Sequence, residues 1–240
     1  IAETSLTIEG IRLVVDCAQE RVASFDPRTG LTKLLTQRIS QASMIQRAGR
    51  AGRLEPGICL HLTSAEQAER AVQQSTPEIL QSDLSGLVME LLQWGCPDPA
   101  QLTWLNPPPA VNLTAARNLL TRLGALDGSR LTAQGQKMAA LGNEPRLAAM
   151  LVAAQDDDDI ATAAKLAAIL EEPPRGGNSD LAIAFSRNQP NWQQRAQQLC
   201  RRLNSRGGTP DSSRIASALA QAFPDRVARR RGLDGRYQLA

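Results

Sequence analysis

The sequence predicts a partial α/β fold followed by a mostly helical region, in a chain of 240 residues. Two short apolar runs, IRLVVD at 11–16 and ICLHL at 58–62, are typical of buried strands. From Ser64 onward, apolar residues recur at helical spacing, and alanine and leucine are frequent. Aromatic residues make up only 3% of the chain, which favours helical packing over a β-rich core.

Residues 1–62 contain the predicted strands, a hairpin and a helix. RVASF and LTKLLT flank the turn sequence DPRTG, which predicts a hairpin over 21–36. Ser40 or Ser43 is expected to cap a helix that runs through Arg47 and Arg50. Two strands and one helix cannot close a doubly wound sheet, so this region is expected to be the back half of an α/β domain.

The next region predicts helices and one small hairpin. Ser64 and Gln67 resemble a capping box, and Thr76-Pro77-Glu78 is expected to open a longer helix reaching Leu92. A second helix at 113–123 precedes Asp127-Gly128, a tight-hairpin signal. This order of helix, helix and hairpin is the outline of a winged helix.

Residues 143–206 predict a bundle of alanine-rich helices, interrupted by a Pro/Gly break at 171–180. The acidic run at 156–159 is expected to begin a helix, because carboxylates there accept from free N–H groups and favour the helix dipole. The stretch 195–236 has ten arginines against three acids. It predicts either part of a groove for a nucleic-acid backbone or a solvated charged face.

Composition limits the classes of partner. Of 27 basic residues only Lys33, Lys137 and Lys165 are lysine, and an arginine bias suits phosphate partners or reflects a GC-rich genome. The four cysteines are scattered, which predicts a reducing, cytoplasmic setting and no metal site. No signal peptide or long apolar run occurs, so we expect a soluble chain; its start, IAETSL, lacks methionine and suggests a fragment.

The run IQRAGRAGR at 45–53 combines three arginines with two glycines. Each glycine costs about 1 kcal/mol relative to alanine inside a helix. The glycines are therefore expected to permit close packing, while the arginines project toward a phosphate that gains charge in a transition state. The alternative is an exposed basic helix with incidental glycines.

A second segment, IAETSLTIEG at 1–10, places hydroxyl groups directly before the first strand. Such hydroxyls and the neighbouring N–H groups suit phosphate oxygens, although helix capping explains them as well.

Together these segments, with ISQAS and LTAQGQKMAALGNEPRLAAML, resemble the DEAH-box helicases of superfamily 2, and most of all their bacterial HrpB-type members. IAETSLTI is similar to motif V and QRAGRAGR to motif VI of the second RecA-like domain. The resemblance covers essentially the whole chain. It implies an ATP-dependent RNA helicase.

The resemblance also implies roles for individual residues. Gln46, Arg50 and Arg53 match the positions that face the ATP γ-phosphate, with catalytic and nucleotide-binding roles, and Arg47 matches a supporting position. Ser5 and Thr7 match positions that contact the nucleic-acid backbone. Glu9 stands where many relatives have Asp near the nucleotide.

The family order implies four regions, with the α/β part RecA-like and the last part resembling the start of an OB-fold. They are the end of the second RecA-like domain (1–75), a winged helix (76–142), a ratchet-like helical bundle (143–210), and a connecting helix with the start of an OB-like domain (211–240).

Two signatures of a complete ATPase are absent from the sequence, G-x-x-x-x-G-K-[ST] and D-E-x-H. The phosphate cradle and the ligands of Mg²⁺ are therefore expected outside this chain, in an N-terminal RecA-like partner domain of the same protein. The isolated chain is expected to be inactive, to bind single-stranded nucleic acid in the form of RNA, and to have no membrane partner.

Two other functions remain open. A winged helix could belong to a non-enzymatic regulator that reads a specific duplex, with Arg117, Asn118 and Arg122 on the candidate recognition helix. A helical interaction scaffold would bind no nucleic acid.

Overall fold

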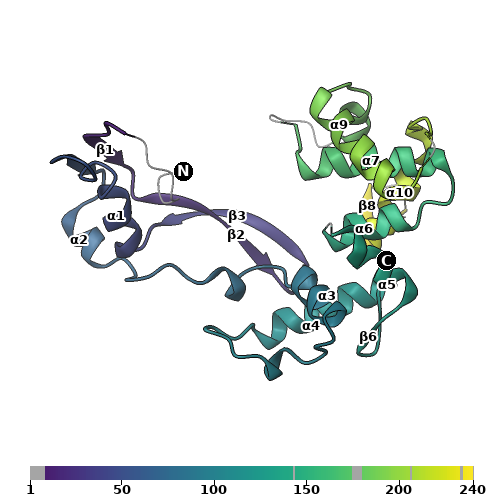
Figure 1. The fold of residues 1–240 in the computed structure, drawn as a ribbon, viewed down its shortest axis with the longest axis horizontal. Helices are drawn as coiled ribbons and strands as arrows, with labels where there is room; N and C mark the ends of the chain where they lie inside the picture. The colour runs from purple at the N-terminus through teal and green to yellow at the C-terminus, as the bar shows by residue number, and fades with distance from the viewer. Residues whose placement is uncertain (1–8, 143, 175–179, 206, 233–234, 240) are drawn as a thin grey trace. The chain divides into compact units, whose positions relative to one another are not determined.

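The computed structural model describes residues 9–142, 144–174, 180–205, 207–232 and 235–239 (Figure 1). These residues form two compact units. The first contains the described residues up to 83 and also 103–112, and the second contains 84–102 and the described residues from 113 onward.

The first unit contains a parallel strand pair, a hairpin and two short helices. These elements are β1 (Leu13–Asp16), β2 (Gln19–Asp26), β3 (Leu31–Arg38), α1 (Gln41–Ala48), β4 (Ile58–His61) and α2 (Ala65–Glu69). Strands β1 and β4 pair in parallel, with Asp16 opposite His61. Leu13 and Ile58 remain about 60% exposed on this pair.

The hairpin is confirmed and is longer than predicted. Strands β2 and β3 pair without interruption from Gln19–Arg38 to Asp26–Leu31. The turn is closed by Asp26, whose carboxylate accepts from Arg28 N at 3.0 Å. Figure 1 shows this ribbon extending away from α1, α2 and β1. All eight residues of β3 are exposed.

The prediction of a single helix that opens at Thr76-Pro77-Glu78 and reaches Leu92 is wrong. A 3₁₀ turn covers Glu78–Leu80, and α3 begins only at Ser85 and ends at Gln93. The carbonyl of Gln81 accepts from Phe25 N at 2.8 Å, and the carbonyl of Ser82 accepts from Asn112 Nδ2 at 3.1 Å. In a continuous helix these carbonyls would accept from N–H groups four residues ahead, so tertiary hydrogen bonds replace helical ones here.

The region that follows is mostly helical, as predicted. Its helices and strands are α4 (Ala110–Arg122), β5 (Leu126–Asp127), β6 (Arg130–Leu131), α5 (Ala133–Leu141), α6 (Pro145–Val152), α7 (Asp157–Glu171), α8 (Leu181–Phe185), α9 (Pro190–Arg202), α10 (Ile215–Ala222), β7 (Ala228–Arg231) and β8 (Arg236–Leu239). Further 3₁₀ turns cover Pro99–Gln101, Ser212–Arg214 and Pro224–Arg226. The predicted hairpin at Asp127-Gly128 is confirmed as β5–β6, and β7–β8 forms another antiparallel pair.

Helix α7 lies at the centre of the bundle and contacts α6, α8, α9 and α10. Its small side chains explain this position, because alanine lets neighbouring helices approach closely. Seven of its residues are at most 1% exposed: Thr162, Ala163, Ala164, Leu166, Ala167, Ala168 and Ile169.

Two predicted helix starts are confirmed. Asp156 caps α7 by accepting from Asp159 N at 2.7 Å. Ser64 caps α2 by accepting from Gln67 N at 3.2 Å. None of the helices in the described ranges is both long and apolar enough to cross a bilayer.

Candidate functional site

The arginine- and glycine-rich segment begins on α1, whose first turn is firmly held. Ser40, 1% exposed, caps the helix by accepting from Ser43 N at 3.1 Å. The side-chain amide of Gln41 donates to the carbonyls of Glu69 and Ala71 at 2.8 and 3.0 Å. These bonds tie the start of α1 to the region around α2.

The helix ends earlier than predicted. It stops at Ala48, and Arg50 lies in the turn that follows, where its N–H donates to the carbonyl of Arg47 at 3.1 Å. Arg53 lies farther along, beyond the helix. The prediction of a helix through Arg50 is therefore wrong, and a turn conformation presents Arg50.

The role predicted for the two glycines is also not borne out. A Cβ on Gly52 would meet no described atom within 4 Å, and one on Gly49 would meet only carbonyls of its own helix, at 3.4 and 3.5 Å. Close approach occurs instead at Gly57, where a Cβ would overlap the backbone and side chain of Ala51. Ala51 is 3% exposed, so Gly57 lets β4 start against the turn after α1.

The predicted nucleotide-contacting residues differ in exposure. Gln46 on the last turn of α1 and Arg53 are exposed, whereas Arg50 is half-buried. Each of the three also interacts with other residues of the chain. Glu9 is exposed in a turn before β1, and the positions of Ser5 and Thr7 lie outside the described residues.

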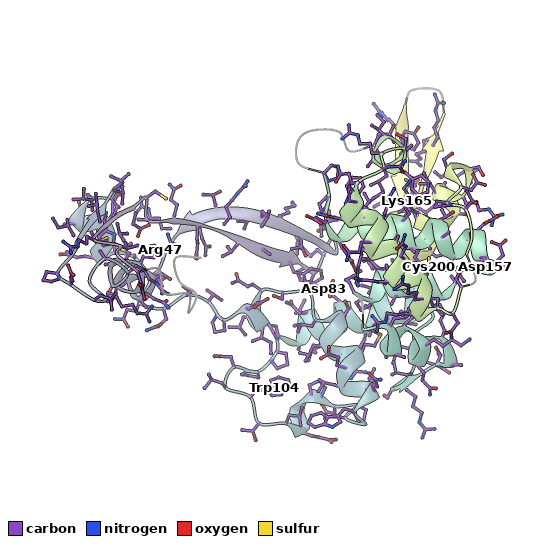
Figure 2. All side chains as sticks on the ribbon, turned by 45° about the horizontal axis from the view of Figure 1, so that its top comes forward. Arg47, Asp83, Trp104, Asp157, Lys165 and Cys200 are labelled. Carbon is purple, nitrogen blue, oxygen red and sulfur yellow. The ribbon has the colours of Figure 1, made fainter. Side chains whose placement is uncertain are left out.

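Arg47 forms an ion pair with a buried aspartate. Its Nη1 donates to Asp16 Oδ1 at 3.0 Å and to the carbonyl of Gln19 at 3.1 Å. The Asp16 side chain is 3% exposed and that of Arg47 is 15% exposed. Figure 2 labels Arg47 in the first unit. The ion pair links the end of α1 to the end of β1, which supports a positioning role for Arg47.

Asp16 is a residue that sequence reasoning missed. Its Oδ1 also accepts from Ala18 N at 3.1 Å, which holds Ala18 in a left-handed conformation with φ of 54°. Its Oδ2 lies 3.4 Å from His61 Nδ1, and neither atom has a hydrogen-bond partner among the described residues. An aspartate directly after a β-branched run was the available signal.

Cys59 lies beside this group. Its Sγ is 3.6 Å from His61 Nε2. Burial, and secondarily the charge of Asp16, raises the pKa of the Cys59 thiol. A raised pKa makes the thiol less reactive near neutral pH. In the part of the chain that the structure covers, no three His, Cys, Asp or Glu side chains are arranged to hold a metal ion.

We expect Arg47→Met to lower the free energy of unfolding by about 1–3 kcal/mol, because the buried carboxylate of Asp16 then loses a hydrogen bond. Urea denaturation of the chain measures this. Arg28→Met is the matched control, since the Arg28 side chain is 88% exposed, and it should change stability by less than about 0.5 kcal/mol. Equal effects of the two substitutions would contradict the structural role of Arg47.

Two arginines of the basic stretch 195–236 form ion pairs with carboxylates of the bundle. Arg195 pairs with Glu171 at 2.6 Å, and this hydrogen bond raises the pKa of Arg195. Arg214 bridges Asp156 and Asp159 at 2.8 and 2.7 Å. These arginines stabilise the fold, so only part of the stretch is available to a partner.

Comparison with known proteins identifies proteins that are similar to the chain. No protein-family model matches it. It is 79% identical, over all 240 residues, to the protein described as ATP-dependent RNA helicase HrpB of Escherichia coli K12. Crystal structures of the E. coli DEAH/RHA helicase HrpB and of the E. coli DExH-box NTPase HrpB superpose with TM-scores of 0.92 and 0.85, each at 78% identity over 99% of the chain.

The chain spans about 30% of the length of each of these proteins. The match is continuous along the chain and extends to the fold. The chain therefore matches, along its whole length, a segment of the DEAH/RHA helicase HrpB.

Proposed function

We propose that the chain is the part of an ATP-dependent RNA helicase that supplies arginines to the γ-phosphate of ATP and grips the nucleic-acid strand. One observation carries this proposal: 79% identity over all 240 residues to a protein named as an ATP-dependent RNA helicase. QRAGRAGR, on the end of α1 and the turn after it, gives the proposal its chemistry.

In this proposal Arg50 and Arg53 stabilise the negative charge that develops on the transferred phosphoryl group, and Gln46 orients the attacking water or touches the same phosphate. Guanidinium groups stabilise such charge best when their positions are fixed before the reaction. The cap at Ser40 and the ion pair of Arg47 support this requirement, because they fix α1 at both ends.

The remaining parts of the ATP site lie outside the chain in this proposal. The donors at Gln46, Arg50 and Arg53 suit phosphate oxygens, whereas the sequence has no phosphate-cradle motif of the P-loop type. We therefore assign the cradle and the Mg²⁺ ligands to an N-terminal RecA-like domain of the same protein. Glu9 then approaches the nucleotide, and Ser5 and Thr7 contact the RNA backbone.

The later regions would hold the strand, with 76–142 as a winged helix, 143–210 as a ratchet-like bundle and 211–240 leading into an OB-like domain. Arg229, Arg231 and Arg236 share one face of β7–β8, since Arg231 pairs opposite Arg236. Like charges placed opposite each other in a hairpin repel. A phosphate backbone on this face would relieve the repulsion.

The alternative regulator would read bases from α4. Among its three candidate side chains, Arg117 donates to the carbonyl of Pro97. That hydrogen bond competes with base contacts and disfavours the regulator.

One titration of the 240-residue chain separates the functions. We expect sequence-independent binding to single-stranded RNA that weakens steeply with salt, as backbone contacts require. The ligands are single-stranded RNA, mixed-sequence duplex and a defined palindromic duplex at several salt concentrations. Preference for the palindrome would favour the regulator, and absence of all binding would favour a scaffold.

A further inference from the structure

We propose that a cavity between α7 and α9 binds a nucleoside phosphate, either free or as one nucleotide of a strand. The cavity has a volume of about 650 Å³, within the range of pockets that enclose small ligands. All its lining residues belong to the second unit. The proposal therefore does not depend on the function assigned to the first unit.

The chemistry of the lining points to an anion. Lys165 on α7 and Arg201 on α9 supply two cations, and Asn188, Gln193 and Gln197 supply carboxamides. No carboxylate lines the cavity among the described residues. Cations bind the phosphate, while carboxamides donate to and accept from the edge of a base.

The two cations differ from three other arginines of the bundle. Arg146, Arg195 and Arg214 each pair with a carboxylate. Within the described ranges, neither Lys165 nor Arg201 takes part in a salt bridge. Lys165 is half-buried, and a half-buried cation ordinarily finds a counter-charge, so its position fits an external anion, beside which Arg201 is exposed.

The position of Lys165 is already set. Its ammonium lies 4.6 Å from the centre of the Phe185 ring, and Phe185 is 4% exposed. Figure 2 shows Lys165 and Cys200 in the helical bundle. Burial lowers the pKa of Lys165, and a bound phosphate would raise it again.

One wall of the cavity is formed by Ser205, Gly207, Gly208 and Pro210, and hydrogen bonds hold it to α7. Ser205 Oγ donates to Asp157 at 2.7 Å, and Thr209 N donates to Asp158 at 2.8 Å. A Cβ on Gly208 would overlap the backbone of Asp157. The wall is thus preformed, which reduces the ordering cost of binding.

The chain offers two direct readouts of binding. It has only three lysines, so ¹³C-methylation of lysine gives separate NMR signals for Lys165 and for the internal controls Lys33 and Lys137. Cys200 lines the cavity, whereas Cys17 is exposed. Burial raises the pKa of the Cys200 thiol, so alkylation is followed at alkaline pH.

The probes are AMP, adenosine, inorganic phosphate and a short single-stranded oligoribonucleotide. We expect AMP to shift only the Lys165 signal, to raise the Lys165 pKa and to slow alkylation of Cys200. Binding by AMP identifies a free nucleotide as sufficient, and binding by the oligoribonucleotide alone identifies a nucleotide within a strand. Both results support the proposal.

Lys165→Met and Arg201→Met should each weaken binding about tenfold, the size expected for loss of a charge-assisted hydrogen bond. Arg202→Met is the matched control, because it removes the same charge from the neighbouring position of α9 and should change affinity by less than about twofold. The proposal is overturned if no probe binds, if phosphate or adenosine binds as well as AMP, or if all three variants bind alike.

Discussion

Under the proposed function, Arg50→Ala or Arg53→Ala is expected to lower strand-stimulated ATP hydrolysis on the order of 10³-fold or more when placed in a full-length HrpB-type protein. The reason is the loss of a fixed guanidinium at the phosphate whose charge grows during transfer. Steady-state ATPase with saturating RNA measures the loss. RNA binding should remain near normal, since neither arginine is assigned to the strand.

Matched controls separate chemistry from folding. Arg70→Ala removes an arginine that pairs with Glu66 and is 77% exposed, and it should leave turnover near normal. Arg50→Lys keeps the charge but not the planar fork, so it should retain only part of the activity. Near-normal turnover of either alanine variant would refute the role of that arginine. The 240-residue chain alone should hydrolyse no ATP.

Much of the fold could be predicted because its signals are local. The turn DPRTG specifies the β2–β3 hairpin within five residues, and the carboxylate of Asp26 closes that turn. Asp156 caps α7 three residues from its donor, Asp159. Sequence spacing alone describes such contacts.

The contacts that escaped prediction join distant residues. Asp16 and Arg47 are 31 positions apart, and they meet only because β1 and β4 pair in parallel beside α1. The break between the 3₁₀ turn and α3 likewise depends on Phe25, which bonds the carbonyl of Gln81. A periodic apolar pattern cannot show that a distant N–H will take a helical carbonyl.

The arginine motif illustrates both cases. Its residues were identified by their order in QRAGRAGR, but their conformations were not. A residue without a side chain is needed at Gly57, four residues beyond the motif, because the backbone there packs directly against Ala51. Arg47 differs from Arg50 through its partner Asp16. The order of residues in the motif thus indicated a phosphate-binding role, whereas the conformation of each arginine depends on packing against distant residues.

Arg146→Met is expected to lower the free energy of unfolding by about 3–5 kcal/mol, the usual loss when one partner of a buried ion pair is removed. Arg146 is 5% exposed. Its Nη1 and Nη2 donate to the two oxygens of Asp225 at 2.5 and 2.8 Å, and Nη1 also donates to the carbonyl of Ala222 at 3.1 Å. Denaturant unfolding of the chain measures the change.

The pH dependence of this pair has a defined sign. The hydrogen bond from Arg146 lowers the pKa of Asp225 below its ordinary value of 3.8. A carboxyl whose folded pKa is depressed contributes its full stability above the unfolded pKa and loses it as the pH falls through the folded pKa. As the pH falls below about 4, the free energy of unfolding should therefore decrease less in the Asp225→Asn variant than in the wild type.

Two variants test whether the ion pair itself is responsible. Arg226→Met removes a more exposed cation that stacks on the same Phe223 ring at 4.8 Å, and it should cost about 1 kcal/mol or less. Arg146→Met combined with Asp225→Leu removes both charges and should recover part of the single-variant loss, because no buried charge then remains unpaired. If the double variant were as unstable as the sum of the two single variants, the stabilisation would come from packing of the Arg146 stem rather than from its pairing with Asp225.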